Sequence, residues 1–163
     1  RGPHPLPLFL ATLQSAAGAD RVLLAAALAG LARYQQAPPA APRAPRPAVA
    51  QVGGISLRDC GGHGPPLVVV PSLINPPDVL DLAPGNSLVG HLAAAGWHPY
   101  LVDWGAMPEP LGLEALAMTR LAPLIAALGQ TVPIIGHCLG GTLALAAARS
   151  GNAGAVAVLA APW

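Results

Sequence analysis

The stretch that most constrains this chain is residues 132–142, VPIIGHCLGGT. An apolar run leads into Gly-His-Cys-Leu-Gly at residues 136–140, and a Gly/Ala-rich helical pattern follows. A strand, a sharp turn of small residues and then a helix form the context that the nucleophile elbow G-x-S-x-G requires. Cys138 stands where that pattern has serine. Glycines flank the nucleophile because the turn is strained and larger side chains would clash across it. The stretch therefore predicts that Cys138 is a nucleophile for acyl transfer.

Composition limits the classes of function. The chain has 163 residues, of which 53% are apolar and 9% charged, so it is long and apolar enough for one domain with a real core. A net charge of +1 gives no field that would attract nucleic acid, and no nucleic-acid partner is expected. The longest apolar helical stretch, residues 22–32, is about half of the roughly 20 residues that a membrane span needs. The sequence therefore predicts no transmembrane segment, and no signal-peptide pattern opens it.

Three segments of different composition follow one another. Residues 1–37 are expected to form a helical N-terminal extension, with one helix over Leu6–Ala17 and a second that Asp20 caps and that runs to about Gln36. Residues 38–48 are rich in Pro, Ala and Arg and are predicted to be a semi-rigid linker. Residues 49–163 carry the strand and helix patterns of the main domain.

The main domain alternates between strand and helix patterns. A hairpin around Gly53-Gly54 opens it, and residues 71–84 are predicted to be loop. Further strands are expected at 67–70, 100–102, 132–136 and 155–160, and helices at 88–95, at 113–128 with a kink or break at Pro123, and at 139–150. This order is typical of a mostly parallel sheet with helices on both faces. It predicts an α/β-hydrolase-type sheet, truncated after the strand that follows the nucleophile elbow.

The elbow implies a specific chemistry for its neighbours. Cys138 would lie at the N-terminus of a helix, where the helix dipole favours the thiolate. The oxyanion formed on an attacked carbonyl needs N–H donors, and the N–H of Leu139 is the first candidate. The second is expected in the loop after the third strand, within Leu73-Ile74-Asn75, and Ile74 and Asn75 are taken as the candidates.

The other nucleophilic or basic residues lack this support. Cys60 falls where a strand meets a turn with no base nearby and is expected to be a structural thiol, and two cysteines make no disulfide framework. His137 neighbours the nucleophile in the elbow, points elsewhere and is better suited to orient the loop or line the site. The remaining histidines, at 4, 63, 91 and 98, lie in predicted turns or helical segments, and no Asp, Glu or His follows Cys138.

Three motifs, in order, resemble the polyhydroxyalkanoate (poly-3-hydroxybutyrate) synthases of the α/β-hydrolase superfamily. They are VPSLINPPDVLDLAPGNSL at 70–88, YLVDWG at 100–105 and IGHCLGGT, a lipase-like box with Cys, at 135–142, and the ending LAAPW adds to them. The resemblance implies a cytoplasmic acyltransferase that acts on small-molecule 3-hydroxyacyl-coenzyme A through a thioester on Cys138. It implies no metal and no cofactor apart from the coenzyme A thioester itself as substrate. It also implies an Asp and a His beyond Trp163, so we expect this N-terminal portion to be inactive alone.

Two alternatives stay open from the sequence. The same scaffold would serve a thioesterase or esterase, in which water accepts the acyl group. A catalytically dead fragment that only binds a partner is the other alternative. That partner would be a second copy in a homodimer, a different subunit or the surface of a polymer granule.

Overall fold

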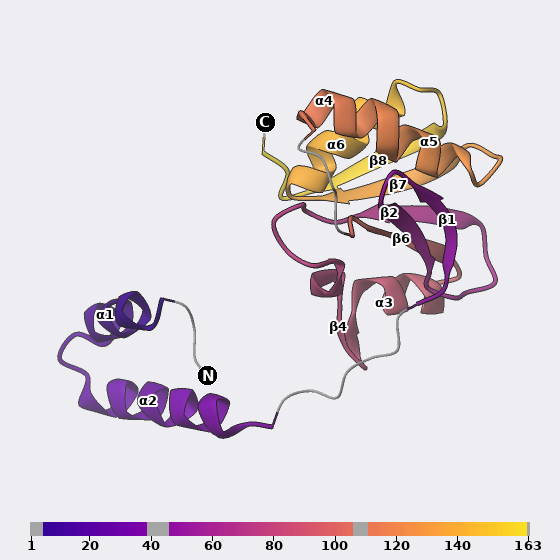
Figure 1. Ribbon diagram of the computed structural model, residues 1–163. Helices are drawn as coiled ribbons and strands as arrows, with labels where there is room; N and C mark the ends of the chain where they lie inside the picture. The colour runs from indigo at the N-terminus through magenta and orange to yellow at the C-terminus, as the bar shows by residue number, and fades with distance from the viewer. Residues whose placement is uncertain (1–4, 39–45, 106–110, 163) are drawn as a thin grey trace. The chain divides into compact units, whose positions relative to one another are not determined.

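The computed structural model describes residues 5–38, 46–105 and 111–162, and the chain divides into two compact units, Arg1–Ala44 and Pro45–Trp163 (Figure 1). Most of the predicted linker, residues 39–45, lies outside the described residues, as do residues 106–110, which contain the loop that the sequence predicts at 107–110. The described end of the linker already belongs to the second unit, because Ala48 begins its first strand.

The first unit contains the two predicted helices, α1 (Leu6–Ala17) and α2 (Arg21–Gln36). Asp20 caps α2, as the sequence predicts, because its side chain accepts hydrogen bonds from the N–H groups of Val22 and Leu23 at 3.0 and 2.9 Å. A cap of this kind satisfies two of the backbone donors that the first turn of a helix leaves unpaired.

The second unit is built on a six-stranded sheet in the order β1-β2-β6-β3-β7-β8. The first two strands form the predicted hairpin and pair in antiparallel fashion, and β2 pairs antiparallel with β6. The strands β6, β3, β7 and β8 are all parallel to one another. The bounds are β1 (Ala48–Val52), β2 (Ile55–Asp59), β3 (Pro66–Val70), β6 (His98–Asp103), β7 (Val132–His137) and β8 (Ala153–Leu159). The predicted mostly parallel sheet is confirmed.

Helices cover both faces of this sheet (Figure 1). Helix α3 (Leu88–Ala94) lies on one face, and α4 (Leu113–Leu116), α5 (Ala122–Ala126) and α6 (Leu139–Ala148) lie on the other. The central strand β3 contributes to both cores because its side chains alternate. Val69 belongs to the cluster that includes Val89 of α3, whereas Val68 and Val70 belong to the cluster with α4–α6. Burial on both faces explains the uninterrupted apolar run of β3.

The helical run that contains Pro123 is distorted rather than broken. A π-helical turn, η2 (Ala117–Leu121), lies between α4 and α5 and ends just before the proline. Proline has no N–H for the carbonyl one turn earlier and clashes with it in a regular α-helix. A wider turn at this point relieves that clash, so Pro123 is accommodated by a π-helical turn.

The loop predicted at residues 71–84 contains regular structure, and this prediction is wrong in part. A 3-10 turn, η1 (Pro77–Leu80), is followed by β4 (Asp81–Ala83), which pairs with β5 (Asn86–Ser87). Strands of three and two residues are too short to show a period in the sequence. The last strand also begins two residues earlier than predicted, at Ala153.

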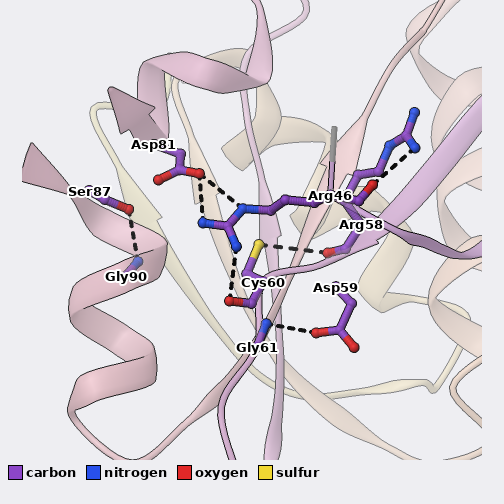
Figure 2. Close-up of polar contacts among 8 residues, drawn as sticks. All are labelled: Arg46, Arg58, Asp59, Cys60, Gly61, Asp81, Ser87 and Gly90. Atoms are coloured by element: carbon purple, nitrogen blue, oxygen red, sulfur yellow. Dashed lines mark hydrogen bonds and ion pairs between the residues drawn. The ribbon is translucent and has the colours of Figure 1, made fainter. Parts of the chain in front are cut away.

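Arg46 fixes the start of the second unit to this small ribbon (Figure 2). Its Nε and Nη2 donate to Oδ2 of Asp81 at 2.9 and 2.7 Å, and its Nη1 donates to the carbonyl of Cys60 at 3.0 Å. A guanidinium that binds one carboxylate through two N–H groups is a strong and directional contact. It joins the end of the Pro/Ala/Arg tract to β4 and to the end of β2.

Candidate active site

Cys138 lies at the junction of β7 and α6 with a strained backbone. Its φ is 54° and its ψ is −132°, a conformation that residues with a side chain rarely adopt. Neighbouring elements hold it there, because its N–H donates to the carbonyl of Leu159 in β8 at 2.8 Å and its carbonyl accepts from Gly141 at 2.8 Å. Strain of this type persists only where surrounding structure enforces it, and it is frequent at functional sites. The strand, sharp turn and helix predicted around Cys138 are all present.

The two glycines that flank Cys138 are required by close backbone contacts. A Cβ at Gly136 would lie 2.5 Å from Cα of Gly141, inside any allowed contact. A Cβ at Gly140 would overlap the carbonyl oxygens of Val70 and Pro71 at the end of β3. The clash across the turn that the G-x-C-x-G pattern predicts is therefore confirmed at Gly136. At Gly140 the clash is instead with the end of β3, on which α6 packs directly.

Cys138 is a partly exposed residue with a free thiol, and this thiol forms no hydrogen bond to any residue that the structure describes. It precedes a helix of 10 residues, whose N-terminal dipole favours an anion at this place. The N–H of Leu139 belongs to the first turn of that helix, where N–H groups have no intrahelical acceptor. These two features are what an attack on a carbonyl requires of the elbow.

The loop after β3 is held by a fully buried serine. The Oγ of Ser72 accepts a hydrogen bond from the N–H of Ile74 at 3.2 Å, and Ser72 is 0% exposed. The N–H of Ile74 is thus engaged within the loop, while the Ile74 side chain is exposed and Asn75 follows at the surface. The oxyanion roles of Leu139, Ile74 and Asn75 stay predictions. A contribution from Ile74 would require its bond to Ser72 to open.

The Asp-Trp-Gly turn after β6 contacts the start of the loop that follows β3. The sequence did not predict this contact. Trp104 is buried, and its Nε1–H donates to the carbonyl of Pro71 at 3.1 Å. Asp103 accepts from Nε and Nη2 of Arg58 at 3.1 and 2.9 Å and from the N–H of Gly105 at 3.0 Å. A buried tryptophan usually needs an acceptor for its indole N–H. The presence of Trp104 in the sequence could therefore have indicated a hydrogen bond of this kind.

The structure corrects the predicted position of His98 and shows the surroundings of His137. His98 begins strand β6, so its placement in a turn or helix is wrong, and its Nε2 lies 2.7 Å from Oδ1 of Asp59. Because β6 and β7 are parallel to β3, the start of β6 and the elbow lie at opposite edges of the sheet. His98 is therefore not a base for Cys138. His137 has a buried Nδ1 with no hydrogen-bond partner among the described residues.

Cys60 is buried, as predicted for a structural thiol, and burial raises its pKa to about 11. Its Sγ lies 3.7 Å from the carbonyl of Arg58 (Figure 2). Residues 5–38, 46–105 and 111–162 contain no group of three or more His, Cys, Asp or Glu side chains that could hold a metal ion. No helix within these ranges has the length and apolar character needed to cross a bilayer.

Solved structures share this architecture. The chain is similar to an α/β hydrolase from Sphaerobacter thermophilus, with 25% identity, a TM-score of 0.54 and coverage of 69% of this chain and 44% of that one. It is equally similar to an epoxide hydrolase from an endophytic Streptomyces, with 25% identity, a TM-score of 0.55 and coverage of 72% and 37%. This is an α/β-hydrolase fold. The predicted fold class is confirmed.

Curated relatives confirm the predicted resemblance of this α/β-hydrolase chain to polyhydroxyalkanoate synthases. A protein of Haloarcula marismortui named poly(3-hydroxyalkanoate) polymerase subunit PhaC is 31% identical over 104 residues, which are 59% of this chain and 22% of that protein. A protein of the same name from Haloferax mediterranei is 34% identical over 91 residues, 49% of this chain and 18% of that protein. The chain thus spans about a fifth of the length of these relatives. No protein-family model matches it.

Proposed function

We propose that this chain carries the nucleophile of a polyhydroxyalkanoate synthase-like acyltransferase that takes 3-hydroxyacyl-coenzyme A as its substrate. The observation that carries the proposal is the elbow itself, with a free, partly exposed Cys138 in a strained turn before α6. The names of the curated relatives supply the substrate class, because those proteins are polymerases of 3-hydroxyalkanoates.

In the proposed reaction the thiolate of Cys138 attacks the carbonyl carbon of the substrate thioester. The N–H of Leu139 and a donor from the loop after β3 stabilise the oxyanion. The intermediate expels the thiolate of coenzyme A, which takes up a proton, and the acyl group remains on Cys138. The hydroxyl of a second 3-hydroxyacyl group then loses its proton and attacks that thioester. The bond between the carbonyl carbon and the sulfur breaks, the thiolate of Cys138 leaves, and the ester bond of the product is formed.

A cysteine suits this sequence of steps for an energetic reason. Exchange of one thioester for another is nearly isoenergetic, so the enzyme can hold the acyl group and still pass it on. No Asp, Glu or His follows Cys138 in the 163 residues. The proposal therefore takes the acid and base that handle the two protons from residues outside this sequence.

The test is mass spectrometry of the full-length protein, which includes the residues that supply the acid and the base, after incubation with 3-hydroxybutyryl-coenzyme A. We expect an adduct of one 3-hydroxybutyryl group on Cys138, absent in Cys138→Ala and retained in the matched control Cys60→Ala. The same adduct in Cys138→Ala, or none in the wild-type protein, would overturn the assignment of the nucleophile. Complete absence of acylation would favour the alternative of a chain that only binds a partner.

Hydrolysis is a second candidate, favoured by the hydrolases among the similar solved structures at 25% identity. In that case water attacks the Cys138 thioester and free 3-hydroxy acid is released. Chromatography of the products separates the two proposals, because transfer yields oligomers and hydrolysis yields only the free acid.

A further inference from the structure

We propose that Trp104 is a positioning residue for the oxyanion loop, through the hydrogen bond that its indole N–H donates to the carbonyl of Pro71. This inference rests on the proposed function, because the oxyanion loop matters only if Cys138 attacks a carbonyl. It assigns to the Asp-Trp-Gly turn a role in the reaction that acts through the carbonyl of Pro71.

The first support is the place of the two residues in the sheet. Trp104 directly follows β6 and Pro71 directly follows β3, and these strands are parallel neighbours. Both residues therefore lie at the edge of the sheet where Cys138 follows β7. The N–H···O distance is 3.1 Å and Trp104 is only 5% exposed, so water competes little for this bond.

The second support is the contact on the other side of Pro71. The carbonyl oxygen of Pro71 lies so close to Cα of Gly140 that a Cβ there would overlap it. Gly140 is in the first turn of α6, two residues after Cys138. The Pro71 carbonyl is thus held between the indole of Trp104 and the helix that presents the nucleophile.

The third support is the short path from Pro71 to the proposed donors. Ser72, the next residue, is fully buried and binds the N–H of Ile74 through its Oγ at 3.2 Å. A displacement of the Pro71 carbonyl is therefore passed through Ser72 to residues 73–75, which carry the second oxyanion donor of the proposal. Removal of a whole donor lowers the rate of acyl transfer about 10²- to 10³-fold in enzymes of known mechanism. A displaced donor should cost less, about tenfold.

The experiment compares two reactions of the Cys138 thiol in the full-length protein that includes the residues supplying the acid and the base, in a Cys60→Ala background. Acylation by p-nitrophenyl acetate passes through an oxyanion, whereas alkylation by iodoacetamide is a displacement at a saturated carbon and needs no oxyanion donor. In Trp104→Phe we expect acylation to slow about tenfold relative to alkylation. Trp97→Phe, which changes a tryptophan packed in the other core cluster, is the matched control and should leave the ratio unchanged.

Each outcome supports or overturns either the positioning role of Trp104 or the proposed function on which it rests. An unchanged ratio in Trp104→Phe, or an equal loss of both rates, would overturn the positioning role. If wild-type Cys138 is alkylated but never acylated, the proposed function fails first, and this result is distinct from the other two. If Trp104→Phe does not fold by circular dichroism, site-specific replacement of Trp104 by 3-benzothienylalanine keeps the shape, removes the N–H and repeats the test.

Discussion

Replacing Cys138 with glycine and with alanine separates the strain of the elbow from its thiol. Both variants lose the sulfur and with it the proposed acylation. Only glycine relieves the backbone, because Cys138 has a φ of 54° and a ψ of −132° and alanine keeps the Cβ that makes this conformation costly. The pair therefore measures how much stability the chain gives up to present a side chain at this turn.

The expected difference follows from two opposing terms. A non-glycine residue in such a region costs about 1–3 kcal/mol, which glycine would recover. Glycine also gains freedom in the unfolded chain, which costs about 0.4–1 kcal/mol of stability relative to alanine. We therefore expect Cys138→Gly to be more stable than Cys138→Ala by about 1 kcal/mol. For a unit of the size of Pro45–Trp163 this corresponds to about 4 °C in the midpoint of thermal unfolding.

The measurement is urea unfolding of both variants, followed by circular dichroism, with the two curves fitted at a common slope. A Cys138→Gly variant equal to or less stable than Cys138→Ala would refute the reasoning that the turn is strained. A difference in slope would show instead that one variant changes the unfolded state, and the comparison would then be repeated by thermal unfolding.

Three further predictions follow from the described contacts. Gly140→Ala should destabilise the protein by about 1–3 kcal/mol in urea unfolding, because its Cβ would meet backbone oxygens, whereas Gly30→Ala, inside helix α2 with open space around it, should not destabilise it. Cys60 should be alkylated by iodoacetamide at pH 8 far more slowly than Cys138, as peptide mapping would show, since burial raises the pKa of Cys60 to about 11. Burial opposes ionisation of Asp59, but hydrogen bonds from Gly61 and His98 outweigh it and hold its pKa below the ordinary value of 3.8. Its contribution to stability is therefore present above pH 3.8 and lost as the pH falls through the lower folded pKa, so Asp59→Asn should weaken the acid dependence of the unfolding midpoint.

Patterns that depend on local physics could be predicted from the sequence. The hairpin follows from Gly53-Gly54 between two short strands, and the cap of α2 follows from Asp20 before an apolar helix. The elbow follows in part from the glycine at 136, since the clash with Gly141 that requires it is set by the turn itself, whereas Gly140 is required by the distant carbonyls of Val70 and Pro71. These features need only a few neighbouring residues, which is why the sequence is informative about them.

Features that depend on distant residues could not be predicted. The ribbon of β4 and β5 is held in part by Arg46, which is 35 residues from Asp81 in the sequence, and neither strand is long enough to show a period. His98 lies outside the strand predicted at 100–102 because β6 begins two residues earlier, and its partner Asp59, 39 residues away, gives no local signal for that start. Long-range polar contacts of this kind leave no periodic signal, and a single sequence offers nothing else by which to pair them.

The three motifs that resemble those of polyhydroxyalkanoate synthases, and the ending LAAPW, meet at the elbow, and this explains why they are informative as a set. Three strands each end at a residue of one of these motifs, on the side of the sheet where α6 begins. These residues are Pro71 after β3, Trp104 after β6 and Leu159 at the end of β8. Leu159 binds the N–H of Cys138, and Pro71 binds Trp104 and contacts the first turn of α6. The end of the chain adds a hydrogen bond at 3.0 Å from Thr142 of α6 to the carbonyl of Pro162. A G-x-C-x-G pattern alone requires only a sharp turn, whereas the spaced motifs require the contacts that hold that turn in place, so the set is far more specific than the pattern.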